Sequence, residues 1–247
     1  MKGALRRVAK KAIIRVGGTG AGRALIHAAV MEPPPERRLR NVREWPETLS
    51  GFEDLAFLFT TGELNHGVAS LSFDEAAHLF GVARSLGPAT IVEIGRFKGG
   101  STLVFATAKH ADATLWSYDL GGERAPGIVG EEIDVEIEST LARFGRDRGV
   151  HLVRADSRSA EPPAGGCDLL FIDGDHSYEG VRADYAHWQT AVRPGGHLLF
   201  HDAEQPERYA SVSPGVARLV AEIDRGDEHF VRERSAGSIA HFRRRNG

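Results

Sequence analysis

Short apolar runs of strand length alternate with segments of helical spacing between residues 88 and 202. Five such runs occur in this stretch: Thr90–Gly95, Thr114–Asp119, His151–Asp156, Cys167–Asp173 and His197–Asp202. Segments with the apolar spacing of helices lie between most of them: Ser101–His110, Glu131–Arg148 and Tyr178–Val192. Parallel strands are joined by crossover helices that cover both faces of their sheet. The alternation therefore predicts an α/β fold with a doubly wound, mostly parallel sheet.

The last part of the chain has a different pattern. A helical segment at Pro214–Asp224 is followed by two apolar runs, His229–Ser235 and Ser238–Arg243, which are separated only by Ala236 and Gly237. A connection this short predicts a hairpin, since parallel strands need a longer crossover. We therefore expect a seven-stranded sheet whose last strand runs antiparallel to its neighbours.

Helical patterns also precede the alternating region. Residues 50–62 and 72–87 have helical spacing, and Ser72 followed three residues later by Glu75 is typical of a capping box at a helix start. We expect residues 1–87 to form a helical N-terminal segment that serves as a lid or in oligomerisation. Residues 88–247 would then form the main domain.

The composition excludes several classes of protein. The one cysteine, Cys167, rules out an intramolecular disulfide and a cysteine-based zinc site, and it fits a cytoplasmic protein. A net charge of −3 gives no electrostatic case for nucleic-acid binding. No apolar run approaches the ~18 residues of a membrane-spanning helix, so we expect no stable membrane insertion. Ten Lys and Arg against two acids in residues 1–40 would suit an anionic membrane surface or an acidic partner, but the thin apolar face favours a solvated helix or a dimer arm.

The first strand and the first helix of the alternating region are joined by a glycine-rich turn. Its sequence is Glu93-x-Gly95-x-x-x-Gly99-Gly100-Ser101. Glycine lets the backbone turn sharply and approach a ligand closely, and a helix N-terminus offers free N–H groups to a carboxylate. By itself this turn fits a nucleotide site and an ordinary strand-to-helix connection equally well.

Acidic residues stand at the ends of the next two strands. Asp119 ends the second strand, 24 residues after Gly95, where a carboxylate can bind both hydroxyls of a ribose. Asp156 and Ser157 end the third strand, where they could contact an adenine edge. Each carboxylate could instead cap a helix, but caps aligned at the correct strand ends are a less economical explanation.

The order of these residues resembles the class I S-adenosylmethionine-dependent methyltransferases. A dinucleotide dehydrogenase has Gly-x-Gly-x-x-Gly, whereas this chain has Phe97 in that stretch and a Gly-x-x-x-Gly spacing. The resemblance covers residues 88–243 and includes the antiparallel seventh strand. It implies S-adenosylmethionine as cofactor. The residues expected to bind this cofactor are Glu93, Gly95, Gly99, Gly100, Ser101, Asp119, Asp156 and Ser157.

A second pair of strings lies nearer the C-terminus. Phe171-Ile172-Asp173-Gly174-Asp175-His176-Ser177-Tyr178-Glu179 and the segment 193–202 resemble the metal-dependent branch that methylates sugars and natural products, including macrolide-sugar and cephalosporin-modifying enzymes. The resemblance implies that Asp173, His201 and Asp202 hold Mg²⁺ or Mn²⁺ and that His176 is the general base. This chain has His201 where several relatives carry a carboxylate, so His201 is a ligand, a hydrogen-bonding partner of one, or a packed neutral residue.

These observations predict an O-methyltransferase that acts on a hydroxyl of a small acceptor, with a sugar or glycoside favoured. A bound metal would orient the acceptor, and Asp173 and His176 would be its catalytic residues. Two alternatives stay open: a metal-independent small-molecule methyltransferase and a non-catalytic nucleotide-binding module. We further expect a homodimer or a higher homo-oligomer.

Overall fold

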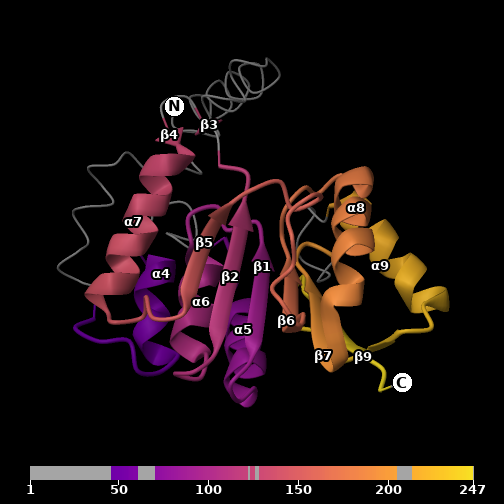
Figure 1. The fold of residues 1–247 in the computed structure, drawn as a ribbon, viewed down its shortest axis with the longest axis horizontal. Helices are drawn as coiled ribbons and strands as arrows, with labels where there is room; N and C mark the ends of the chain where they lie inside the picture. Colours follow the sequence, from indigo (N-terminus) through magenta and orange to yellow (C-terminus); the bar gives the residue numbers. More distant parts are fainter. Residues whose placement is uncertain (1–45, 61–69, 122, 126–127, 205–212, 247) are drawn as a thin grey trace, which may run out of the picture.

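A seven-stranded sheet forms the centre of the molecule (Figure 1). The structure is a computed structural model, and it describes residues 46–60, 70–121, 123–125, 128–204 and 213–246. The strands follow the spatial order β5-β2-β1-β6-β7-β9-β8. Their bounds are β1 Thr90–Ile94, β2 Thr114–Asp119, β5 Val150–Arg154, β6 Cys167–Ile172, β7 Val192–Phe200, β8 Phe230–Arg232 and β9 Ala240–Arg244.

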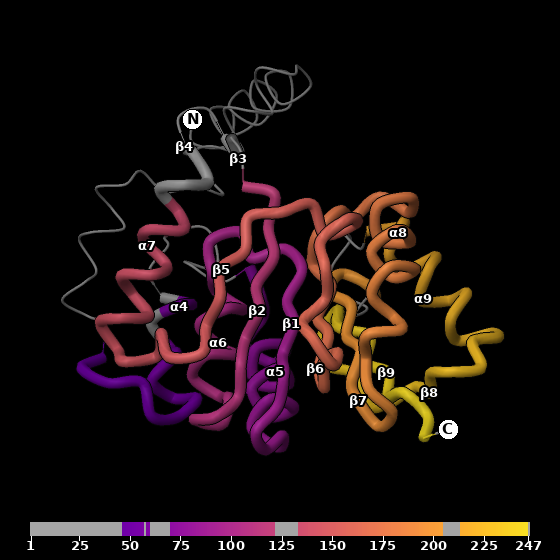
Figure 2. Tube along the Cα trace, in the orientation of Figure 1, coloured from indigo at the N-terminus to yellow at the C-terminus, as the bar shows by residue number. Residues whose placement is uncertain are grey.

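Strand β1 lies near the middle, and the order of the sheet reverses beside it. The chain proceeds from β1 through β2 to β5 at one edge, then crosses back to β6 and continues to β7 (Figure 2). These neighbours pair in parallel, whereas β9 pairs antiparallel with both β7 and β8. The predicted seven-stranded, mostly parallel sheet with an antiparallel last strand is confirmed. Ligands of such sheets bind beyond the carboxyl ends of the strands at the point of reversal, here between β1 and β6.

Helices cover both faces of the sheet. One face carries α5 Phe73–Ser85, α6 Gly100–Ala108 and α7 Gly130–Arg143, together with the short elements η2 Glu53–Ala56 and α4 Phe57–Thr60. The other face carries α8 Tyr178–Trp188, which η3 Gln189–Ala191 follows, and α9 Pro214–Gly226. A separate two-stranded sheet pairs β3 Glu123–Ala125 with β4 Ile128–Val129. None of the helices in the described ranges has the length and apolar character needed to cross a bilayer.

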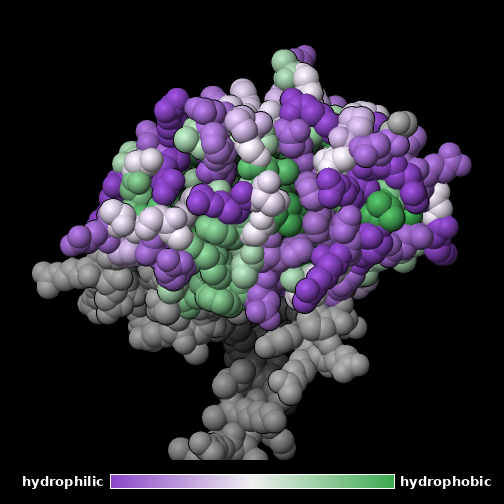
Figure 3. Space-filling view, turned by 90° about the horizontal axis from the view of Figure 1, so that it is seen from below, coloured by the Kyte–Doolittle hydropathy of each residue, from purple (hydrophilic) through white to green (hydrophobic). Residues whose placement is uncertain are grey.

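Strand alternation divides the apolar residues into two cores. Ile91 and Phe171 face α5 and α6, while their neighbours Val92 and Ile172 face α8 and α9. All nine residues of α6 are buried, which explains why this helix shows little polar patterning in the sequence. The face seen from below in Figure 1 is largely hydrophilic, with smaller groups of apolar residues among the charged ones (Figure 3).

Helix α5 packs against the sheet. It begins as the capping box predicts, because the Ser72 hydroxyl accepts from the Glu75 N–H and the Glu75 carboxylate accepts from the Ser72 N–H. Leu79 and Ala83 of this helix belong to the same buried core as Ile91 of β1. The lid or oligomerisation role of residues 1–87 stays a prediction, and residues 1–45 and 61–69 lie outside the described part.

Several element bounds differ from those that the sequence predicts. Of the helix expected over 50–62, the described part forms η2 and α4 from Glu53 to Thr60, and residues 61–62 lie outside the described residues. Helix α7 ends at Arg143 because Gly145 follows with a φ of 61°. Strand β7 begins at Val192, five residues before the expected start at His197, because its first half lies beyond the strictly apolar run. The pattern of apolar residues shows which side chains become buried, whereas the bounds of helices and strands depend on backbone hydrogen bonds.

Candidate active site

The turn between β1 and α6 requires two of its glycines. Gly95 has a φ of 84°, and a Cβ placed there would lie 2.1 Å from the Asp173 carbonyl oxygen. Gly99 has a φ of 81°, and its Cβ would lie 2.6 Å from Cγ1 of Ile137 in α7. Any side chain at Gly95 would therefore separate the ends of β1 and β6, which meet at this turn. The glycine signal of the sequence thus has a steric origin.

Glu93 holds the turn in place from its buried side. Its side chain is fully buried, and its carboxylate accepts hydrogen bonds from the hydroxyls of Ser101 at 2.5 Å, Thr102 at 2.6 Å and Ser117 at 2.5 Å. Burial raises the pKa of Glu93, although the three hydroxyl donors act in the opposite direction. The carboxylate ties β1 to β2 and to the first turn of α6, so it fixes the N–H groups that α6 presents.

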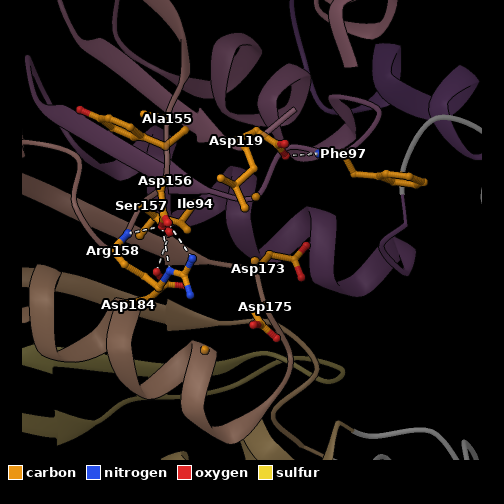
Figure 4. A pocket seen from close by; sticks show the side chains of 15 residues that line it. Ile94, Phe97, Asp119, Ala155, Asp156, Ser157, Arg158, Asp173, Asp175 and Asp184 are labelled. Carbon is orange, nitrogen blue, oxygen red and sulfur yellow. Dashed lines mark hydrogen bonds and ion pairs between the residues drawn. The ribbon is translucent and has the colours of Figure 1, made fainter. Parts of the chain in front are cut away.

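Asp119 links the end of β2 to the same turn. Its carboxylate accepts the backbone N–H groups of Arg96 at 3.0 Å and Gly121 at 2.8 Å. It also accepts the N–H of Phe97 at 3.3 Å (Figure 4). Phe97 has a φ of 44°, an uncommon value for a residue with a side chain. Asp119 therefore holds a strained turn in place while its side chain lines the adjoining cavity.

The cavity opens at the carboxyl ends of β1, β2, β5 and β6 and has a volume of about 290 Å³. It is lined by Ile94, Gly95, Phe97, Tyr118, Asp119, Leu120, Ala155, Asp156, Ser157, Arg158, Asp173, Gly174, Asp175, Gly180 and Asp184. Of the expected cofactor residues, this wall holds Gly95, Asp119, Asp156 and Ser157. Gly100 and Ser101 instead line a small neighbouring hollow of about 20 Å³ beside Phe97 and Asp173. Glu93 and Gly99 lie behind these surfaces.

Arg158 and Asp184 belong to the cavity wall, and the sequence analysis did not select either of them. The Arg158 guanidinium binds both oxygens of Asp156, at 2.8 and 2.6 Å, and lowers the pKa of Asp156 to about 2 (Figure 4). The Ser157 hydroxyl donates to Asp184 Oδ1 at 2.6 Å, and burial raises the pKa of Asp184, which is only 2 % exposed. Asp184 lies on the apolar side of α8, three residues after Val181, and that position was the available signal.

A cluster of acidic and imidazole side chains lies where β6 and β7 end. Asp173 Oδ1 lies 3.2 Å from His176 Nε2 and 3.0 Å from His201 Nδ1. Asp202 Oδ2 lies 3.6 Å from His176 Nδ1. Strand β7 ends at Phe200 and Asp202 has a φ of 53°, so the chain has already turned and both His201 and Asp202 can face Asp173. The structure thus brings together all four residues that the second pair of strings predicts.

The carboxylates of this cluster change the pKa values of its histidines. The hydrogen bond to Asp173 raises the pKa of His176 above its ordinary value, against the effect of partial burial. Burial alone would lower the pKa of His201, but the charges and hydrogen bonds of Asp173 and Glu75 raise it well above that value. Both imidazoles therefore hold a proton more tightly than a free histidine does.

This arrangement does not fit a shared metal ion. Within the described part of the chain, no group of three or more His, Cys, Asp or Glu is arranged to hold one. Asp173 Oδ1 already lies against two imidazoles, and His201 lies between two carboxylates. Ligation by Asp173, His201 and Asp202 stays a prediction.

The chain is similar in sequence and in fold to known methyltransferases. Residues 92–203 match the model of a methyltransferase domain family. The O-methyltransferase TomG from Streptomyces achromogenes, solved in complex with S-adenosylmethionine and involved in tomaymycin synthesis, superimposes with a TM-score of 0.55 at 19 % identity, over 91 % of this chain and 96 % of that one. The fold is that of the S-adenosylmethionine-dependent methyltransferases.

The chain is also similar to a second methyltransferase structure and to a viral protein. A methyltransferase from Geobacter sulfurreducens has a TM-score of 0.53 at 15 % identity, over 72 % of this chain and 81 % of that chain. An uncharacterized protein of Acanthamoeba polyphaga mimivirus is 30 % identical over 142 residues, which are 56 % of this chain, and the chain spans 62 % of its length. The domain match and the structural likeness together support a methyltransferase fold. The sugar acceptor, the metal and the role of His176 go beyond this support.

Proposed function

We propose that this protein is an S-adenosylmethionine-dependent O-methyltransferase acting on a hydroxyl of a small acceptor, most favourably a sugar or glycoside. The observation that carries the proposal is the cavity at the β1–β6 reversal, formed by the Gly95 turn and Asp119, beside the histidine–carboxylate cluster. The match of residues 92–203 to a methyltransferase domain supports it. We also propose a homo-oligomer that acts without nucleic acid or membrane insertion.

The charge of the cavity wall favours this cofactor over a dinucleotide. Five carboxylates line the wall, from Asp119, Asp156, Asp173, Asp175 and Asp184, and Arg158 is the single Lys or Arg among the lining residues. S-adenosylmethionine carries a sulfonium and an ammonium cation, which such a wall attracts. The pyrophosphate of NAD carries negative charge and would be repelled. The electrostatics therefore agree with the glycine spacing.

The contacts of His176 support our assignment of this residue as the general base. When its Nε2–H donates to Asp173, its Nδ1 carries the lone pair, and Asp202 lies 3.6 Å from that nitrogen. Nδ1 takes the proton of the acceptor hydroxyl while the oxygen bonds to the methyl carbon. The C–S bond breaks, and its electron pair goes to sulfur, which leaves neutral S-adenosylhomocysteine. The Asp202 carboxylate stabilises the imidazolium that forms.

The proposed methyl transfer has a metal-dependent and a metal-independent form. The resemblance predicts Mg²⁺ or Mn²⁺ at Asp173 and Asp202, whereas the position of His201 between Glu75 and Asp173 favours the metal-independent form. Exhaustive EDTA treatment separates them. Unchanged turnover supports the metal-independent form, and a loss of turnover that Mn²⁺ or Mg²⁺ restores supports the metal-dependent one.

Calorimetry tests the central claim. We expect the protein to bind S-adenosylmethionine and S-adenosylhomocysteine, and we expect Asp119→Asn to weaken both while the surface variant Asp112→Asn leaves them unchanged. A panel of sugars and glycosides with methyl-labelled cofactor then tests the acceptor class. Absence of cofactor binding would overturn the proposal. Binding without transfer to any acceptor would support the non-catalytic nucleotide-binding module instead.

A further inference from the structure

His201 lies between two carboxylates that come from distant parts of the chain. Its Nδ1 is 3.0 Å from Asp173 Oδ1, and its Nε2 is 3.5 Å from Glu75 Oε2 in α5. The side chains of His201 and Glu75 are only 7 % and 8 % exposed. Asp173 in turn contacts His176 Nε2 at 3.2 Å. Carboxylate and imidazole groups therefore alternate from the helical layer to the proposed base.

Glu75 is held in place more firmly than its capping role requires. One oxygen accepts the Ser72 N–H at 2.6 Å, which completes the capping box of α5. The other accepts the Ser238 N–H at 2.6 Å, just before β9. These two backbone donors hold both carboxylate oxygens in place. The carboxylate is thus a fixed anion that links α5 to the loop before β9 and faces His201.

The His201 ring has one nitrogen without a hydrogen-bond partner. Nε2 is buried, and the nearest acceptor is the Glu75 carboxylate at 3.5 Å, beyond a good hydrogen bond. A buried polar atom without a partner costs free energy and calls for an explanation. With a hydrogen on each nitrogen, the ring donates to Asp173 through Nδ1 and directs Nε2–H toward the Glu75 carboxylate, so the Glu75 charge favours this orientation of the ring.

We propose that Glu75 and His201 are positioning residues that hold the Asp173 carboxylate against His176, so that the base keeps one orientation and one tautomer during methyl transfer. This inference rests on the proposed function. Neither residue is among those that line the cavity, and His201 reaches His176 through Asp173 and, at 3.8 Å, through Asp202.

Two substitutions at His201 separate positioning from simple packing. His201→Leu introduces an apolar side chain of similar bulk and removes the donor to Asp173. We expect kcat to fall about tenfold or more. The amide nitrogen of Asn stands close to the place of Nδ1, so His201→Asn should recover most of that loss. The KM for the acceptor and the affinity for S-adenosylmethionine should change little in either variant.

Glu75→Gln and Ser72→Ala form a matched pair in the capping box. Both weaken the cap of α5, but only Glu75→Gln removes the charge that faces His201. We expect Glu75→Gln to lower kcat several-fold, and we expect Ser72→Ala to lower Tm without changing kcat. Equal kcat values in both variants and in the wild type would overturn the inference.

Long-range ¹H–¹⁵N spectra of the histidine rings provide a measurement that does not depend on turnover. The Nε2–H tautomer of His176 should dominate in the wild type and in His201→Asn, and tautomers should mix in His201→Leu or, if that variant does not fold, in Glu75→Gln. An unchanged tautomer would refute the positioning role. A wild-type protein that neither binds the cofactor nor transfers a methyl group would refute the proposed function itself.

Discussion

Acidification from pH 7 to pH 5 is expected to weaken the fold through His241 of β9. This side chain is 5 % exposed, its Nδ1 lies 3.1 Å from His78 Nε2 of α5, and its Nε2 lies 2.9 Å from His197 Nδ1 of β7. Burial, together with the neighbouring His197 and His78, lowers the pKa of His241 to about 3. The chain of three imidazoles is therefore stable while its members are neutral.

The size and sign of the effect follow from the pKa difference between the two states. The unfolded chain binds a proton at His241 below about pH 6.5, whereas the folded chain stays neutral there until about pH 3. Stability is therefore present above the unfolded pKa and is lost as the pH falls. Because pH 5 lies about 1.5 units below the unfolded pKa, the expected loss of stability is about 2 kcal/mol. The pKa values of His78 and His197 are also lowered by burial, so their effects have the same sign.

Urea unfolding at pH 7 and pH 5 measures this effect. The free energy of unfolding of His241→Gln should fall between these pH values by about 2 kcal/mol less than that of the wild type. The exposed His229 provides the matched control, because His229→Gln should retain the full pH dependence of the wild type. Identical pH dependence in His241→Gln and the wild type would show that His241 does not resist protonation in the folded state.

Three further predictions concern the site and the core. Gly95→Ala should destabilise the fold by about 2 kcal/mol or more in urea unfolding and abolish cofactor binding, because its Cβ would meet the Asp173 carbonyl, whereas Gly87→Ala, with open space around it, should do neither. Asp119→Asn should weaken S-adenosylmethionine binding about tenfold or more in calorimetry, and unchanged affinity would remove Asp119 from the cofactor site. Burial raises the pKa of Cys167 to about 12, so its thiol should resist a disulfide reagent at pH 8 until urea unfolds the chain; rapid labelling of the native protein would contradict this.

Much of the fold could be predicted because its signals are local. The apolar runs that become β1, β2 and β6 are short and bounded, and the positive-φ glycines of the turn have few substitutes. Helix boundaries were less predictable where contacts with the rest of the fold outweigh local helix propensity, as in residues 50–60. Part of the site could be predicted for the same reason. The strand-end residues Asp119 and Asp156 lie on the cavity wall, as the order of strands implies.

The alternation of strands and helices, the glycine turn and the acids and histidines at strand ends can be recognised in the sequence, because each depends on residues close together in the chain. Three contacts emerge only when the chain is folded: Glu93 supports the turn from behind the cavity, Asp184 of α8 faces Ser157, and Glu75 reaches His201. These contacts join elements far apart in sequence, and the direction of each side chain is set by packing of helices on the sheet. No local pattern of polar and apolar positions contains that information.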